Sequence, residues 1–174
     1  MNEFPAESES RRTIKVSISD VKFSTDNSLL KTTLGSCVSV VLFTPHHRSA
    51  QKISSMSHFL LPEVSKLPEA DKRPFRFGSL IIPYQINEML HLGVPKSALQ
   101  AKLCGGANMF ARRHNIALND IGRLNIEMAR QILKAWSIPV VGESVGGNFG
   151  RAVEFDPLSG SLKVLIFGNE AFYI

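Results

Sequence analysis

The sequence has few cysteines and no long apolar run, and both absences narrow what this protein can be. Cys37 and Cys104 are the two cysteines in 174 residues, so a framework of several disulfides is excluded. One Cys37–Cys104 bridge can be drawn, but free thiols are expected because residues 1–12 lack the apolar core of an export signal. The longest apolar stretches, such as residues 38–43, are far too short to span a bilayer. We therefore expect a cytoplasmic protein that is not inserted in a membrane.

A strong excess of charge of one sign is also missing. Lysine and arginine number 20 and aspartate and glutamate 15, so the net charge is +5. The basic residues are scattered and form no long run, so a nucleic-acid partner is not expected, although an acidic protein partner would suit this charge. The five histidines lack zinc-site spacing and no Cys-x-x-Cys is present, so we expect no metal.

The 44% hydrophobic content over this length is typical of one globular domain. We expect a disordered tail over residues 1–12 and a single domain over residues 13–174. Alternating apolar residues predict a strand over 14–18, followed by a polar loop through residue 28. Further apolar and β-branched runs predict strands over residues 29–34, 37–44, 50–61, 99–103 and 138–141, and a hairpin of residues 153–155 with 162–167.

Two segments show helical patterns. Residues 78–92 predict a helix that ends at Gly93, with Pro83 in its first turn or with a later start. Residues 119–136 predict a second helix, capped by Asn119 or Asp120. Its expected apolar stripe comprises Ile121, Leu124, Met128, Ile132, Ala135 and Trp136. The order of elements predicts an α/β layered sandwich, with two main helices packed on a mixed, mostly antiparallel sheet.

The glycine pairs are interpreted as turns. Residues 146–150 resemble part of a dinucleotide-binding loop, but such a loop follows a strand and opens a helix, whereas a β pattern follows here. We therefore interpret Gly146-Gly147, and equally Gly105-Gly106, as turns that need positive φ.

Cys37 and His58 stand out as a pair. If Pro45 faces Ala50 in a hairpin, then Cys37 lies directly opposite His58, with Cβ atoms about 4.5–5.5 Å apart on one face. A single bulge would change this register. Taken singly, each residue has a purely structural interpretation, since buried cysteine is common and a histidine at a strand end is often simply hydrogen-bonded.

Together these two side chains have a definite chemistry. An imidazole can take the thiol proton, which gives a nucleophilic thiolate–imidazolium pair near neutral pH. The backbone N–H groups of the turn Gly35-Ser36-Cys37 could stabilise that thiolate and also form an oxyanion hole.

Several motifs in order resemble one known family. They are Leu34-Gly35-Ser36-Cys37-Val38, Met56-Ser57-His58-Phe59-Leu60-Leu61-Pro62, Gly105-Gly106-Ala107-Asn108-Met109-Phe110, Asn115-Ile116, Ile121-Gly122-Arg123-Leu124-Asn125 and Gly146-Gly147-Asn148-Phe149-Gly150-Arg151. This set is similar to the chemoreceptor glutamine deamidase family, CheD, and it covers residues 14–168. Several separate motifs are far more specific than one short pattern.

The resemblance implies a function. Members hydrolyse the side-chain amide of particular glutamines in methyl-accepting chemotaxis receptors to glutamate and ammonia, and some also remove glutamyl methyl esters. Cys37 matches the family nucleophile and His58 the family base, in a layered α/β fold that needs no cofactor. Members can also bind CheC, a phosphatase of the chemotaxis response regulator. The alternative is an inactive adaptor that binds receptors or CheC; the intact Cys37–His58 pair favours the enzyme.

The chain departs from the family pattern at one position. Many members carry a site threonine six residues before the cysteine, where this chain has Lys31. Thr32 and Thr33 follow, and strand alternation lets only one of them reach the site. We predict that Thr32 orients His58; the alternatives are that Thr33 does so or that the third site residue is missing.

Overall fold

The computed structural model describes residues 11–45, 52–63, 73–108, 121–167 and 169–174. Their strands are β1 (Thr13–Lys15), β2 (Asp20–Ser24), β3 (Leu29–Leu34), β4 (Val38–Phe43), β5 (Ser54–Phe59), β6 (Gln100–Gly105), β7 (Val140–Val145), β8 (Arg151–Asp156), β9 (Ser161–Ile166) and β10 (Phe172–Tyr173). Their helices are α1 (Gly78–His91) and α3 (Ile121–Ala135), with short 3-10 turns η1 (Pro74–Arg76) and η2 (Lys96–Ala98).

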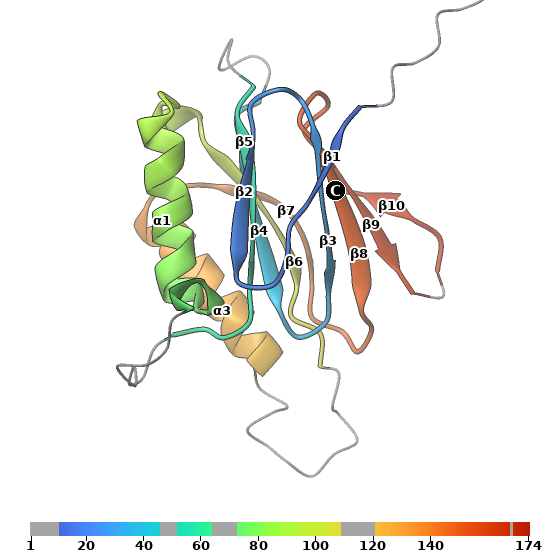
Figure 1. The fold of residues 1–174 in the computed structure, drawn as a ribbon. Helices are drawn as coiled ribbons and strands as arrows, with labels where there is room; N and C mark the ends of the chain where they lie inside the picture. Colours follow the sequence, from blue (N-terminus) through green and yellow to red (C-terminus); the bar gives the residue numbers. More distant parts are fainter. Residues whose placement is uncertain (1–10, 46–51, 64–72, 109–120, 168) are drawn as a thin grey trace, which may run out of the picture.

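These elements form three layers (Figure 1). The middle layer is a sheet of order β2-β5-β4-β6-β7; α1 and α3 cover one face of it, and a second sheet of order β1-β3-β8-β9-β10 covers the other. The pairs β1–β3 and β6–β7 are parallel and the other pairs are antiparallel. The predicted α/β sandwich with mostly antiparallel pairing is therefore confirmed. The strands divide into two sheets because the short turn after β3 carries the chain across from one sheet to the other.

The core has two compartments, one on each side of the middle sheet. Val40 and Leu42 of β4 pack with the helices, whereas Val41 and Phe43 pack between the two sheets. Every residue of β4 is buried, which explains why its sequence is a nearly continuous apolar run rather than an alternating one. The catalytic candidates lie at one end of the inter-sheet compartment.

Strand β2 lies within the segment that the sequence predicted as a polar loop, so that prediction is wrong. β2 forms an edge of the middle sheet, and among the strands that the structure describes it pairs only with β5. An edge strand needs fewer apolar residues, and β2 carries Asp20, Lys22 and Ser24. Because β2 is largely polar, the sequence pattern did not predict it as a strand.

Helix α1 ends as predicted but contains an internal proline. Gly93 has φ 86°, and the Gly93 and Val94 N–H groups donate to Leu90 and Met89, as in a Schellman cap. Pro83 lies inside the helix, beyond its first turn, which corrects both positions expected for it. The missing N–H removes one helical hydrogen bond, and burial of the flanking isoleucines stabilises the helix against that loss.

Helix α3 buries a different face from the predicted stripe. Its buried residues are Gly122, Asn125, Ile126, Ala129 and Leu133, whereas Leu124 of the expected stripe is exposed. Small residues let the helix approach the sheet closely, because a Cβ at Gly122 would lie 2.4 Å from the Gly106 carbonyl oxygen. The expected caps Asn119 and Asp120 lie outside the described residues.

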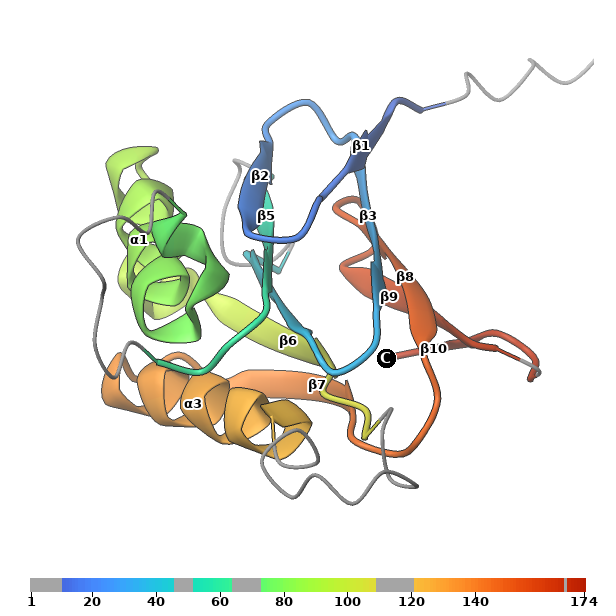
Figure 2. The same ribbon diagram turned by 60° about the horizontal axis from the view of Figure 1, so that its bottom comes forward.

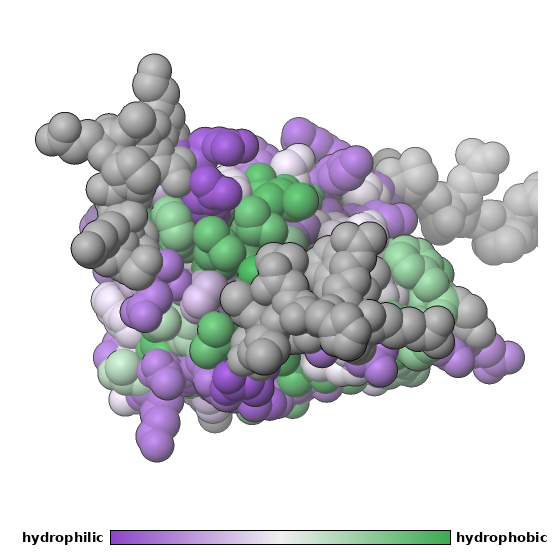
Figure 3. Space-filling view, turned by 90° about the horizontal axis from the view of Figure 1, so that it is seen from below, coloured by the Kyte–Doolittle hydropathy of each residue, from purple (hydrophilic) through white to green (hydrophobic). Residues whose placement is uncertain are grey.

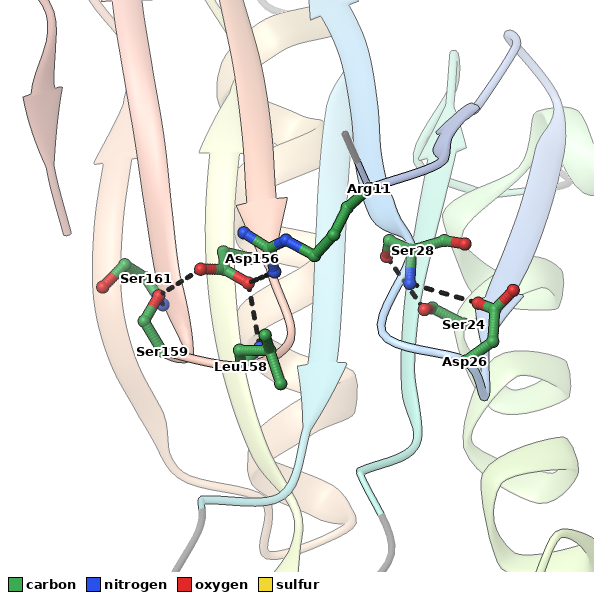
Figure 4. A network of polar contacts seen from close by, with 8 residues as sticks. All are labelled: Arg11, Ser24, Asp26, Ser28, Asp156, Leu158, Ser159 and Ser161. Atoms are coloured by element: carbon green, nitrogen blue, oxygen red, sulfur yellow. Dashed lines mark hydrogen bonds and ion pairs between the residues drawn. The ribbon is translucent and has the colours of Figure 1, made fainter. Parts of the chain in front are cut away.

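The chain is anchored before β1 by polar contacts with the far end of the second sheet (Figure 4). Arg11 pairs with Asp156, whose carboxylate also accepts from the Leu158 N–H, at 2.9 Å. The hydrogen bond from Arg11 holds the pKa of Asp156 at about 2. The Leu29 N–H donates to the Arg12 carbonyl at 2.9 Å. The last two residues of the expected tail thus contact the fold; residues 1–10 lie outside the described part. Among the helices described, none is long and apolar enough to cross a membrane.

Candidate active site

The turn between β3 and β4 joins the two sheets at the lower end of the sandwich. Figure 2 brings this turn forward, beside α3 and the loop between β7 and β8. Both ends of the turn are held by backbone hydrogen bonds from the segment after β6. Gly106 N–H donates to the Cys37 carbonyl at 2.7 Å, and Ala107 N–H donates to the Gly35 carbonyl at 2.8 Å. The residues around the thiol are therefore held by backbone contacts on both sides.

Glycine is required where that segment meets the turn. Gly105 has φ 111°, and a Cβ there would lie 2.2 Å from the Cys37 carbonyl oxygen. Gly106 has φ 69°, and its Cβ would lie 2.5 Å from the Ile126 side chain. The interpretation of this pair as a positive-φ turn is confirmed, and its second purpose is close approach to the cysteine.

Cys37 does not lie directly opposite His58, so the predicted register is wrong. Ser39 is the residue opposite His58, and Val38 is opposite Phe59. The end pair of the ladder is Phe43 with Ser54, so each residue of β4 lies opposite a β5 residue two positions later than expected. A shift of two keeps Cys37 on the same face but makes it a diagonal neighbour of His58. Diagonal Cα atoms lie about 7–8 Å apart, within reach of an aromatic side chain.

Three expected site residues face the layer between the sheets. Cys37 packs in the inter-sheet core with Met56, and His58 follows Met56 by two positions on β5, with 2% of its surface exposed. Thr32 enters the layer from β3 of the opposite sheet and is also buried. The fold thus brings together residues that stand far apart in the chain.

A chain of hydrogen bonds orients the imidazole. The Thr32 hydroxyl donates to the Val16 carbonyl at 2.7 Å, and the same oxygen lies 2.9 Å from His58 Nδ1. Because the hydroxyl proton is committed to Val16, Nδ1 must carry the hydrogen that joins it to Thr32. This leaves His58 Nε2 unprotonated, and Nε2 has no hydrogen-bond partner among the described residues. The imidazole is therefore held in the tautomer that can accept a proton at Nε2.

Strand alternation decides which threonine makes this contact. Thr32 is buried, whereas Lys31 and Thr33 on either side of it are exposed on the outer face of the second sheet. The Lys31 Nζ atom instead lies 3.7 Å from Oε2 of Glu154 on the neighbouring strand. The hydroxyl beside His58 is thus supplied by Thr32 and not by Thr33.

Burial shifts the pKa values of His58 and Cys37 in the directions that favour the uncharged form of each side chain. Burial lowers the pKa of His58 to about 4, against a smaller opposing effect of the Val16 carbonyl. Burial raises the pKa of the Cys37 thiol, against a smaller opposing effect of its own backbone N–H. The thiolate–imidazolium pair expected from the sequence is therefore disfavoured, and burial favours a neutral thiol and a neutral imidazole.

The buried imidazole should make the protein less stable in acid. The pKa of His58 is about 4 in the folded protein and near 6.5 when unfolded, so the unfolded state binds more protons between these values. The free energy of unfolding should fall as pH drops from 6.5 through 4, by about 3 kcal/mol from this group. Urea unfolding at pH 7 and pH 4.5 should show a smaller loss for His58→Gln than for the unsubstituted protein. Equal losses would assign the effect to other groups.

Sequence reasoning missed two contributors to this site. Val16 acts through its backbone carbonyl, for which no residue pattern exists. Asn125 donates from Nδ2 to the Ser36 and Leu60 carbonyls, both at 3.0 Å. The sequence offered one signal for Asn125, a polar residue among apolar helix positions. The predicted apolar stripe, however, placed Asn125 outside the buried face.

The second thiol lies on the neighbouring strand. Cys104 of β6 is opposite Ser39 and is buried between the sheets. Burial raises the pKa of Cys104 to about 11, so it is less suited to form a thiolate. Both cysteines are free. Within the described ranges, no group of three or more histidine, cysteine, aspartate or glutamate side chains is placed to hold a metal ion.

Fold and site together define an α/β sandwich protein with a buried thiol and an oriented imidazole at one end of its sheets. Residues 60–165 match the family model CheD, described as chemotactic sensory transduction. The chain is 38% identical over 162 residues to the "Probable chemoreceptor glutamine deamidase CheD" of Oceanobacillus iheyensis, covering 92% of this chain and 95% of that protein. Proteins of the same name from Caldanaerobacter subterraneus and Desulforamulus reducens are 35% and 36% identical, over 92% and 90% of this chain and 97% and 92% of their own lengths. The chain belongs to the CheD family.

Proposed function

We propose that this protein is a glutamine deamidase that acts on chemoreceptors in the cytoplasm, with Cys37 as nucleophile and His58 as general acid and base. The observation that carries the proposal is the hydrogen bond from His58 Nδ1 to Thr32, which leaves Nε2 as a base in the layer that holds Cys37. The names of the relatives, which describe probable chemoreceptor glutamine deamidases, support the same reaction.

The reaction proceeds through a thioester. The Cys37 sulfur attacks the glutamine side-chain carbonyl carbon while His58 Nε2 accepts the thiol proton, so no separate thiolate is required. Backbone N–H groups of the Gly35-Ser36-Cys37 turn stabilise the oxyanion. His58 then donates its proton to the leaving nitrogen, and ammonia departs as the thioester forms. Water attacks the thioester and gives its proton to His58. The C–S bond breaks, glutamate is released, and the proton returns to sulfur.

The surface around the turn suits a protein substrate rather than free glutamine. Ile18, Phe149 and Phe167 lie in loops at this end of the sandwich and are 56%, 62% and 54% exposed. Ile18 precedes Ser19, whose N–H donates to the His58 carbonyl, and Phe167 N–H donates to Gly150. Figure 3 looks onto this end and shows hydrophobic surface exposed in several places among polar side chains. Exposed apolar side chains near a reacting group are typical of contacts with a macromolecule.

Mass spectrometry of receptor fragments tests the proposal directly. Receptor cytoplasmic fragments should gain about 1 Da at particular glutamines when incubated with the protein, the change from amide to acid, with one ammonia released per site. Fragments incubated without the protein supply the baseline for spontaneous deamidation. If no glutamine gains mass above that baseline, the inactive adaptor becomes the better account.

Loss of the Thr32 hydroxyl should slow the reaction in part. Thr32→Val keeps the shape of the side chain but leaves His58 Nδ1 without its partner, so the barrier should rise by about 1–2 kcal/mol, or roughly 5- to 30-fold in rate. Thr33→Val is the matched control, because Thr33 is exposed on the other face of β3. A slower Thr33→Val enzyme, or no change in Thr32→Val, would show that Thr32 does not orient the base.

A further inference from the structure

Asn125 is a buried amide that joins the turn before Cys37 to the residue that follows β5. It lies on α3 and is fully buried. Its Nδ2 donates to the Ser36 carbonyl, directly before Cys37, and to the Leu60 carbonyl, two residues after His58. The amide oxygen has no hydrogen-bond partner among the described residues. Burying an amide oxygen without a hydrogen-bond partner costs free energy. The two hydrogen bonds that Asn125 does make are therefore expected to serve a specific purpose.

The bond to Ser36 controls the orientation of the next N–H group. Ser36 C=O and Cys37 N–H belong to one planar trans peptide, so they point in opposite directions. Because Asn125 draws the carbonyl toward α3, the Cys37 N–H must point away from the helix. The same N–H acts on the Cys37 thiol, since it opposes the rise in pKa that burial causes. The amide of Asn125 thus sets the direction of a donor next to the sulfur.

The helix also braces the other side of the cysteine. Gly122, one turn before Asn125, allows α3 to approach the Gly106 carbonyl, which a Cβ would contact at 2.4 Å. Gly106 N–H in turn donates to the Cys37 carbonyl at 2.7 Å. One helix face therefore supports the peptides on both sides of Cys37, while the bond to Leu60 ties the same helix to the end of the strand that carries His58.

We propose that Asn125 is a positioning residue that directs the Cys37 N–H toward the developing oxyanion and holds the cysteine turn at a set position relative to β5. This role rests on the proposed deamidase function. The N–H matters most when charge develops on the substrate oxygen, so its loss affects the transition state more than substrate binding.

The test compares two buried amides. Asn125→Leu removes both hydrogen bonds at nearly constant volume. Gln85→Leu is the matched control, because Gln85 of α1 is equally buried and donates from Nε2 to the Val40 carbonyl and the Ser55 hydroxyl, at 3.1 and 2.9 Å. These partners lie on β4 and β5 and not in the cysteine turn. The two variants should lose stability to a similar extent and differ only in the chemistry of Cys37.

Two readouts separate positioning from a purely structural role. The pH dependence of iodoacetamide labelling at Cys37, followed by peptide mass spectrometry, should shift upward by about half to one unit in Asn125→Leu and stay unchanged in Gln85→Leu. The deamidation kcat should fall roughly 10- to 100-fold in Asn125→Leu with KM within about twofold, and both constants should be unchanged in Gln85→Leu.

The labelling profile and kcat of Asn125→Leu decide whether Asn125 positions the Cys37 N–H. An unchanged labelling profile and kcat in a folded Asn125→Leu protein would overturn the positioning role. If Asn125→Leu does not fold, Asn125→Ser gives the same comparison, because the shorter side chain cannot reach both carbonyls. Labelling needs no receptor, so failure of the unsubstituted protein to deamidate would overturn the proposed function while the labelling shift still tests Asn125.

Discussion

Replacing Cys37 with alanine should abolish receptor deamidation while the protein stays folded. No other group in the proposed reaction can form the thioester, so kcat should fall by roughly 10³-fold or more. The turn itself is held by backbone bonds to Gly35 and Cys37 and by Asn125, none of which uses the sulfur. Loss of one buried sulfur should lower the free energy of unfolding by about 1 kcal/mol. The measurement is the mass gain on receptor glutamines, with thermal unfolding recorded on the same sample.

Cys104→Ala is the matched control for this change. Cys104 is buried on the adjacent strand and its pKa is about 11, so its thiol is protonated at neutral pH. The variant should lose stability to a similar or greater extent and keep its turnover. Iodoacetamide should label Cys37 before Cys104. A folded but inactive Cys104→Ala protein, together with an active Cys37→Ala protein, would move the nucleophile to β6.

Removal of the His58 imidazole should cost roughly 10²- to 10⁴-fold in rate, the usual scale for loss of a general acid and base. His58→Ala removes the group proposed to take the thiol proton and to protonate the leaving ammonia. Because burial holds the pKa of His58 near 4, the unsubstituted enzyme should keep its kcat/KM as pH falls from 7 to 5. Activity should decline only as the imidazole becomes protonated near pH 4.

His91→Ala serves as the control for His58. His91 is exposed in the last turn of α1, where it lies 3.5 Å from the Glu88 carboxylate one turn earlier, so its replacement should leave the rate unchanged. A normal rate for His58→Ala, or a large loss for His91→Ala, would contradict the assignment of the base. A pH profile that falls near 6.5 would show that the imidazole titrates as an exposed group does.

Much of the site could be predicted from local patterns. The apolar and Thr-rich run over residues 29–34 indicated a strand, and the period of two along any strand placed Thr32 and Thr33 on opposite faces. The β-branched run over residues 38–43 indicated a strand buried on both sides, and β4 is such a strand. The glycine pair Gly105-Gly106 indicated a positive-φ turn, which the structure has. The motifs around Cys37 and His58 carried the family resemblance, which the comparisons confirm.

Other features depended on contacts between distant segments. The ladder of β4 with β5 pairs Ser39 with His58, so Cys37 is diagonal to His58 rather than opposite. On α3, Gly122 and Asn125 meet backbone groups after β6 and before Cys37. The predicted stripe left out the apolar Ile126, Ala129 and Leu133, which are buried on the same face as these two residues.

By itself the sequence determined which residues could do the chemistry and which face of each strand they occupy, because side-chain direction along a strand follows a local period of two. Only the tertiary structure decided that the Thr32 hydroxyl lies between the Val16 carbonyl and His58, that Asn125 donates to the carbonyl before Cys37, and that burial lowers the pKa of His58 and raises that of Cys37. Hydrogen-bond partners and burial depend on which segments meet in space, and pKa values follow from that burial.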